Sequence, residues 1–136
     1  TSDWHPYHHC SFADEGGQWP RHCVQHSAGA AIWEPLLVTL NESKGGFTLL
    51  YKGDSIQRDE YSIMQNEVSA DVINRLVRAL GIEQIDVCGL AGDICVLNTA
   101  EDLKHRGGNT RLNILEAYAP SLDGGSTLKA FIKTLD

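Results

Sequence analysis

From residue 47 onward, apolar positions recur with two spacings. Three short apolar runs predict buried strands, because runs of this length bounded by glycine or polar residues are typical of strands covered on both faces. These runs lie at residues 47–52, 84–90 and 110–117. Apolar residues spaced as on a helix predict helices at residues 68–80, 93–106 and 126–135. Strands that alternate with helices predict an α/β fold with a mainly parallel sheet.

The ends of the predicted helices carry residues that favour termination or capping. Gly81 follows the first helix, and Gly107 and Gly108 follow the second. We interpret Ser126 as the N-cap of the third helix and Asp93 as the N-cap of the second, because short oxygen-bearing side chains can accept the first backbone N–H groups.

Residues 1–46 are rich in glycine and proline, predict loops, and hold five of the six histidines. The chain shows no internal repeat and no linker. We therefore expect a single domain over residues 1–136, a length sufficient for one substantial core.

Composition narrows the classes of partner. The net charge of −7, without a basic stripe, argues against nucleic-acid binding. No apolar run is long enough to cross a bilayer, so we expect no membrane partner. The core needs no disulfides, and the four cysteines fit a reducing compartment such as the cytoplasm. The cysteines are Cys10, Cys23, Cys88 and Cys95.

Cys95 lies in the turn from the second predicted strand into the following helix, where reactive groups of parallel sheets gather. A helix N-terminus favours the nucleophilic thiolate, and its backbone amides can hold a developing oxyanion. Lys52 ends the preceding strand at the same sheet edge and is a candidate to stabilise that thiolate. The alternatives are a buried core cysteine and a solvated lysine.

Asp3 and His5 stand two residues apart, so both side chains point the same way from an extended segment. With His22 they form a three-ligand set that leaves metal positions open for water or substrate. His8, His9 and Glu15 are further candidates. The alternative is a group of surface histidines without a metal.

Together these motifs resemble the nicotinamidases, within the isochorismatase-like cysteine hydrolases. Asp-x-His followed by Trp-Pro-x-His is the specific part of the pattern, and separates nicotinamidases from isochorismatase-type relatives. The matching stretches, in the order the family has them, are residues 3–12, 19–25, 27–30, 51–53, 59–62, 89–96 and 99–100. The resemblance implies a three-layer α/β/α fold.

The resemblance also implies roles for individual residues. Cys95 would be the nucleophile, Lys52 its cationic neighbour, and the amides of Ala91 and Cys95 the oxyanion hole, with a cis peptide between Leu90 and Ala91. The metal, zinc or else iron or manganese, would be held by Asp3, His5 and His22. Trp19 and Tyr61 would wall a flat aromatic pocket, and His9 or Glu15 is a candidate fourth ligand.

The chain differs from the family pattern at two positions and lacks one strand. Gly92 stands where members often have threonine, and Ile94 precedes the nucleophile at a variable position. The family's first strand, which ends in the aspartate of an Asp-Lys-Cys triad, has no counterpart here. No aspartate of the chain matches that position, including Asp54, Asp59, Asp86 and Asp93. We therefore expect residues 1–136 to be an N-terminally incomplete domain, inactive alone and completed by further chain or another polypeptide.

The implied function is metal-dependent hydrolysis of nicotinamide to nicotinate and ammonia through a cysteine thioester, as in pyridine nucleotide salvage. The first alternative is a related cysteine amidase that acts on another small amide. The second is a non-enzymatic remnant of the fold. The expected partner is the small amide itself, and a homo-oligomer is compatible with the sequence.

Overall fold

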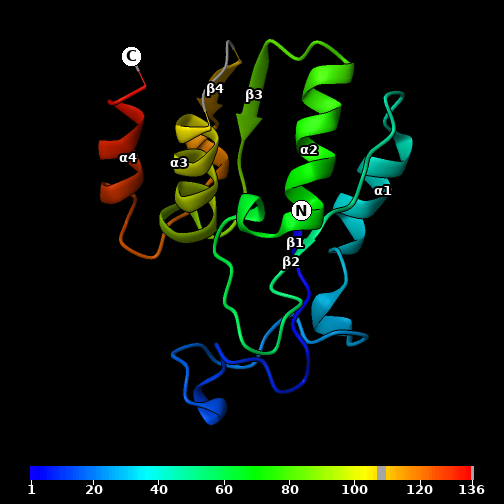
Figure 1. The fold of residues 1–136 in the computed structure, drawn as a ribbon, viewed down its shortest axis with the longest axis vertical. Coiled ribbons are helices and arrows are strands. Elements are labelled where there is room, and N and C mark those ends of the chain that lie inside the picture. Colours follow the sequence, from blue (N-terminus) through cyan, green and yellow to red (C-terminus); the bar gives the residue numbers. More distant parts are fainter. Residues whose placement is uncertain (107–109, 136) are drawn as a thin grey trace. The chain divides into compact units, whose positions relative to one another are not determined.

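The computed structural model describes residues 1–106 and 110–135, which form two compact units divided after Glu60 (Figure 1). Each unit contains one pair of parallel strands, and helices follow or flank them. The predicted α/β class with parallel strands is therefore confirmed. The single domain over residues 1–136 stays a prediction. No helix in the described ranges has both the length and the apolar character needed to cross a membrane.

The N-terminal unit pairs β1, Ser2–Asp3, with β2, Tyr51–Lys52. Asp3 lies opposite Lys52, and the Trp4 amide donates to the Lys52 carbonyl at 3.0 Å. The strand predicted at 47–52 is confirmed only at its end, as β2. Just before β2, the Leu50 carbonyl accepts the Ser2 N–H at 2.9 Å. The register puts an acid and a base side by side at the carboxyl ends of both strands.

Helix α1, Glu34–Glu42, was not expected in the segment predicted as loop. Pro35 suggested a turn, yet it occupies the first helical turn, where a missing N–H costs nothing. The helix buries none of its residues, and Leu36 and Val38 are about half exposed. Two short 3-10 helices complete the unit, at Ala13–Glu15 and Ala28–Ala30.

The C-terminal unit is built on β3, Gln84–Val87, and β4, Arg111–Ile114, which run parallel and side by side (Figure 1). Its other elements are a 3-10 helix at Ile63–Gln65, α2 at Glu67–Ala79, a π-helical turn at Gly92–Val96, α3 at Leu97–His105, a 3-10 helix at Glu116–Tyr118, and α4 at Ser126–Ile132. Its buried core consists of Val96, Leu97, Ala100, Ile114, Ala119 and Leu128.

The helix predicted at 68–80 is confirmed as α2. Asn66 caps it by accepting the Ser69 N–H at 3.1 Å, and Gly81 follows it with φ 59°. Only part of the apolar face of α2 is buried, since Val68 and Leu80 are exposed. The helix predicted at 93–106 begins instead as the π-helical turn, and the glycines expected to stop it lie outside the described residues.

Both predicted caps are wrong. The Asp93 carboxylate accepts the N–H groups of Leu122 and Asp123, at 2.9 and 3.0 Å, and so links the two loops that follow β3 and β4. Ser126 is the first residue of α4 and donates its hydroxyl to Asp123 at 2.8 Å. Gly125 is the N-cap, and the Asp123 carboxylate, two residues before it, accepts the Thr127 N–H at 2.9 Å.

Candidate functional site

The predicted metal ligands of the N-terminal unit meet at one place. Asp3, His5 and His22 each offer a ligand atom, and these atoms lie within 4.8 Å of one another. Asp3 ends β1, and His5 forms a parallel bridge with Val24. The His5 N–H donates to the Cys23 carbonyl at 2.9 Å, so the backbone brings the segment carrying His22 beside His5. Backbone pairing therefore brings His22 to the same site as Asp3 and His5, although these residues are distant in the sequence.

The ring nitrogens of both histidines are oriented for metal binding. Nδ1 of His5 donates to the Gly53 carbonyl at 2.8 Å, and Nδ1 of His22 donates to the Pro20 carbonyl at 2.8 Å. A carbonyl can only accept, so in each neutral ring the proton sits on Nδ1 and the Nε2 lone pair is available. This is the usual arrangement of metal-ligating histidine. The donor set therefore fits a divalent metal.

The protonation of His5 agrees with this arrangement. Its side chain is 2% exposed, and burial lowers its pKa below the ordinary value. The Gly53 hydrogen bond and the Asp3 charge oppose that shift without cancelling it. The neutral ring, which is the form that binds metals, is therefore the favoured one at neutral pH.

Lys52 is buried beside the candidate metal ligand Asp3. Its ammonium contacts Oδ1 of Asp3 and donates to the Glu60 carbonyl at 2.8 Å. A carboxylate has two oxygens, so the Lys52 contact leaves Oδ2 of Asp3 for coordination. Lys52 and Cys95 belong to different units, and their predicted pairing stays a prediction.

His9 is fully buried, but its ring nitrogens have other partners. Nε2 donates to the Arg58 carbonyl at 3.1 Å, and Nδ1 accepts from the Ser11 hydroxyl at 2.7 Å. The His9 ring stacks on His5 with centroids 4.1 Å apart. In this arrangement His9 supports the His5 ring rather than offering a lone pair to the cluster.

Glu15, the other candidate fourth ligand, is engaged at the surface. It accepts from Nδ1 of His8 at 2.6 Å and from Arg21 at 3.0 Å. The His8 hydrogen bond, followed by the charges of His8 and Arg21, lowers the pKa of Glu15. Glu15 and His8 are not part of the described three-residue cluster.

Gly53 and Glu60 belong to the site, although the sequence suggested a role for neither. Gly53 has φ 66°, and a Cβ there would lie 2.3 Å from Cε1 of His5. The buried Glu60 carboxylate accepts the Gly53 N–H at 2.7 Å. A glycine after a strand-end lysine could have suggested close approach, but no sequence signal shows that Glu60 is buried.

Cys95, the predicted nucleophile, lies in the π-helical turn of the C-terminal unit and is half-buried. The Ala91 carbonyl begins this turn by accepting the N–H groups of Ile94 and Val96, at 3.2 and 3.1 Å. The peptide between Leu90 and Ala91 is cis, as the resemblance implied. No disulfide joins any of the chain's four cysteines, all of which the structure describes.

Known proteins are similar to this chain in sequence and in fold. No family model matches the chain. The nicotinamidase/pyrazinamidase of Mycobacterium tuberculosis is 34% identical over 82% of this chain and 59% of its own length. An L. infantum protein solved in complex with nicotinate is 35% identical, with a TM-score of 0.82, over 98% of this chain and 66% of its own. The chain belongs to the nicotinamidase family, among the isochorismatase-like hydrolases.

A pyrazinamidase of Pyrococcus horikoshii, solved in complex with zinc, is 27% identical with a TM-score of 0.77. The match covers 98% of this chain and 69% of that one. The chain spans 54–64% of the length of the curated nicotinamidases that it matches.

Gly92 is a departure from the nicotinamidase pattern that packing explains. Its N–H donates to the Pro120 carbonyl at 2.8 Å, and a Cβ would lie 2.2 Å from the Ala119 carbonyl oxygen. A side chain at this position would push away the loop that follows β4. Glycine therefore permits the close approach of the two loops that support the Cys95 turn.

The two residues predicted to wall the nicotinamidase pocket are both half-buried. Trp19 is held by backbone bonds, since its N–H donates to the Ser11 carbonyl at 2.9 Å and its carbonyl accepts the Ala13 N–H at 2.8 Å. Tyr61 opens the C-terminal unit. Their contact with a substrate ring stays a prediction.

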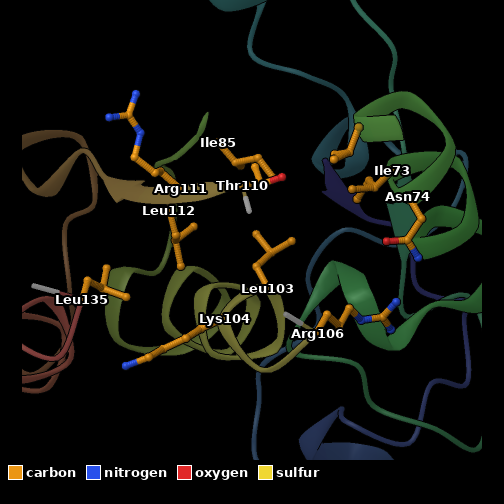
Figure 2. A pocket seen from close by; sticks show the side chains of 11 residues that line it. Ile73, Asn74, Ile85, Leu103, Lys104, Arg106, Thr110, Arg111, Leu112 and Leu135 are labelled. Carbon is orange, nitrogen blue, oxygen red and sulfur yellow. The ribbon is translucent and has the colours of Figure 1, made fainter. Parts of the chain in front are cut away.

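A cavity of about 290 Å³ lies elsewhere in the C-terminal unit (Figure 2). Ile85 of β3, Leu103 of α3 and Leu112 of β4 line it, while the Arg111 guanidinium points away from Leu112. None of the residues predicted for the nicotinamidase site lines it.

Proposed function

We propose that the protein is a nicotinamidase that hydrolyses nicotinamide to nicotinate and ammonia. The observation that carries the proposal is the convergence of Asp3, His5 and His22 in a chain of the nicotinamidase family. The relatives' names and the nicotinate bound to the L. infantum protein support the substrate. A reducing compartment such as the cytoplasm suits the reaction, because the nucleophile must stay a free thiol.

We assign the metal to Asp3, His5 and His22, with zinc as the first choice over iron and manganese. Two imidazoles and one carboxylate are ligands that zinc accepts in catalytic sites, where a further position stays open. The zinc complex of the Pyrococcus horikoshii protein supports this choice. When bound, the ion would offer a coordination position to the pyridine nitrogen and so orient the carboxamide.

Cys95 is assigned as the nucleophile. Its thiolate attacks the carboxamide carbon, and the carbonyl π electrons move onto oxygen. The backbone N–H groups of Ala91 and Cys95 would stabilise that oxyanion. Lys52 would hold the thiolate as the neighbouring cation. Trp19 and Tyr61 would stack against the flat ring and exclude water from it.

Collapse of the oxyanion breaks the C–N bond, and the nitrogen leaves as ammonia with the proton taken from the thiol. By resemblance, the carrier of that proton is the aspartate of the family's first strand, which matches no acid of residues 1–136. Water then attacks the thioester, which releases nicotinate and returns Cys95 to the thiol.

Steady-state rates on a panel of amides test the proposal. The full-length protein loaded with Zn²⁺ should hydrolyse nicotinamide and pyrazinamide. Benzamide should be slower, because it has the same ring shape without the ring nitrogen, and acetamide slower still. A preference for aliphatic amides would indicate a related cysteine amidase. A folded, zinc-loaded protein that hydrolyses none of them would indicate a non-enzymatic remnant.

A further inference from the structure

We propose that Glu60 is a positioning residue of the metal cluster. Its buried carboxylate fixes the peptide that joins Lys52 to Gly53, and through this peptide it orients His5 and Lys52. The inference rests on the proposed metal site, and it assigns a role to a residue that is not one of the three ligands.

The Glu60 side chain is 0% exposed. One carboxylate oxygen, Oε2, accepts the Gly53 N–H at 2.7 Å, and Oε1 accepts from the Arg58 guanidinium. A buried carboxylate needs hydrogen-bond donors, and the Gly53 N–H is the donor that joins it to the Lys52–Gly53 peptide, whereas the half-exposed Arg58 side chain contacts it without touching that peptide in the bonds described. Because a carboxylate acceptor strengthens a hydrogen bond, the Gly53 N–H is firmly held.

The Lys52–Gly53 peptide is held at both of its polar ends. Its N–H donates to Glu60, and its carbonyl, that of Lys52, accepts the Trp4 N–H at 3.0 Å. A peptide unit is planar, so two opposed hydrogen bonds fix its orientation. The orientation of this plane sets where the Gly53 backbone continues.

The next carbonyl along the chain, that of Gly53, accepts Nδ1–H of His5 at 2.8 Å. This bond sets the tautomer and the direction of the His5 ring. The ring also packs directly on the Gly53 Cα, where a Cβ would lie 2.3 Å from Cε1 of His5. A displaced Gly53 would therefore turn or release a metal ligand.

Glu60 acts on a second ligand through Lys52. The Glu60 carbonyl accepts from the Lys52 ammonium at 2.8 Å, and the same ammonium contacts Asp3. The Glu60 backbone and side chain together thus hold the groups that bond two of the three ligands, Asp3 and His5. Removing the Glu60 side chain would release the peptide that leads to the Gly53 carbonyl, and so the His5 ring, while the backbone bond from Lys52 to the Glu60 carbonyl would remain.

The alternative is that Glu60 forms only a structural ion pair with Arg58. The two roles separate in the Arg58→Ala background, because the Arg58 side chain is 53% exposed and does not touch the Lys52–Gly53 peptide in the bonds described. In that background, Glu60→Gln keeps an amide oxygen for the Gly53 N–H. Glu60→Ala removes the acceptor altogether.

The experiment measures Zn²⁺ affinity of the full-length protein by competition with a chelator, and the ring nitrogens of His5 by NMR in the metal-free protein. Urea unfolding checks that each variant is folded. Arg58→Ala should bind zinc as the wild type does, and Arg58→Ala with Glu60→Gln should stay near it. Arg58→Ala with Glu60→Ala should bind about 10–100-fold more weakly, the usual effect of losing the support of a ligating histidine.

In the alanine variant, the His5 nitrogens should also lose the signature of a fixed Nδ1–H. The inference is overturned if the folded alanine variant matches the glutamine variant in zinc affinity, or if Arg58→Ala alone weakens binding as much. If Arg58→Ala with Glu60→Ala does not fold, the variant with Glu60→Gln decides: when that variant is folded but binds Zn²⁺ more than about tenfold more weakly than Arg58→Ala, the inference is overturned. A wild-type protein that binds no Zn²⁺ would instead show that the proposed metal site is wrong.

Discussion

Gly53→Ala should disable the metal cluster by displacing one ligand. The added Cβ would lie 2.3 Å from Cε1 and 2.5 Å from Nδ1 of His5. Non-bonded carbon atoms settle at about 3.5–4.0 Å, so the ring would have to move by about 1.2 Å or more. Zinc–nitrogen bonds near 2.0–2.1 Å tolerate errors of only about 0.2 Å, so this displacement removes His5 from the ligand set.

Stability should fall as well, for two separable reasons. Gly53 has φ 66°, in the left-handed region, where an L-residue costs about 1–2 kcal/mol. Alanine recovers about 0.4–1 kcal/mol of this by restricting the unfolded chain. The overpacking against His5 adds about 1–3 kcal/mol. We therefore expect the free energy of unfolding to drop by about 1–5 kcal/mol.

Gly46→Ala is the matched control, because Gly46 has the same φ of 66° and a Cβ there would meet nothing within 4 Å. It should lose about 1 kcal/mol or less and keep wild-type zinc affinity. Zinc affinity by chelator competition and urea unfolding are the assays. If Gly53→Ala binds zinc as tightly as Gly46→Ala, the placement of His5 against Gly53 is wrong.

Three further predictions follow from individual side chains. Asp123→Asn should lower the urea midpoint at pH 7, because hydrogen bonds, first from Thr127, lower the Asp123 pKa and stabilise the folded protein. This stabilisation is lost progressively as pH falls below about 4, so the difference between the two midpoints should be smaller at pH 2 than at pH 7. Equal midpoints at pH 7 would contradict this. Cys95 should be alkylated first at pH 6. Cys10 should react slowly, because burial and then the nearby Asp59 charge raise the Cys10 pKa. If peptide mass spectrometry finds Cys10 labelled first, the assignment of Cys95 as the nucleophile is wrong. Asp3→Asn should lower the bound zinc found by elemental analysis, and an unchanged content would remove Asp3 from the ligand set.

Local patterns in the sequence predicted the elements and motifs that depend on neighbouring residues. Helix α2 and its end at Gly81 followed from the apolar spacing and the glycine. The convergence of Asp3, His5 and His22 followed from the Asp-x-His spacing combined with the resemblance. Strands β2, β3 and β4 lie within the predicted runs, though they are shorter, whereas β1 lies in the segment predicted as loop.

Features set by distant contacts could not be predicted. Asp93 looked like a cap, but the loop after β4 offers it two N–H groups, which only the fold brings near. The segment of helix α1 was predicted as loop because of residues such as Pro35, and none of the helix residues is buried. Glu60 is an ordinary acid in the sequence, and its burial against Gly53 depends on how the chain returns to β2.

The central claim is that Cys95 carries out hydrolysis of nicotinamide. The direct measurement is the rate of nicotinate formation by the full-length, zinc-loaded protein and by Cys95→Ala, with Cys88→Ala as the control because Cys88 is exposed and has no assigned role. We expect Cys88→Ala to match the wild type and Cys95→Ala to lose at least about 10³-fold in kcat, as removal of a nucleophile does. A Cys95→Ala variant that forms nicotinate as fast as Cys88→Ala would contradict the account.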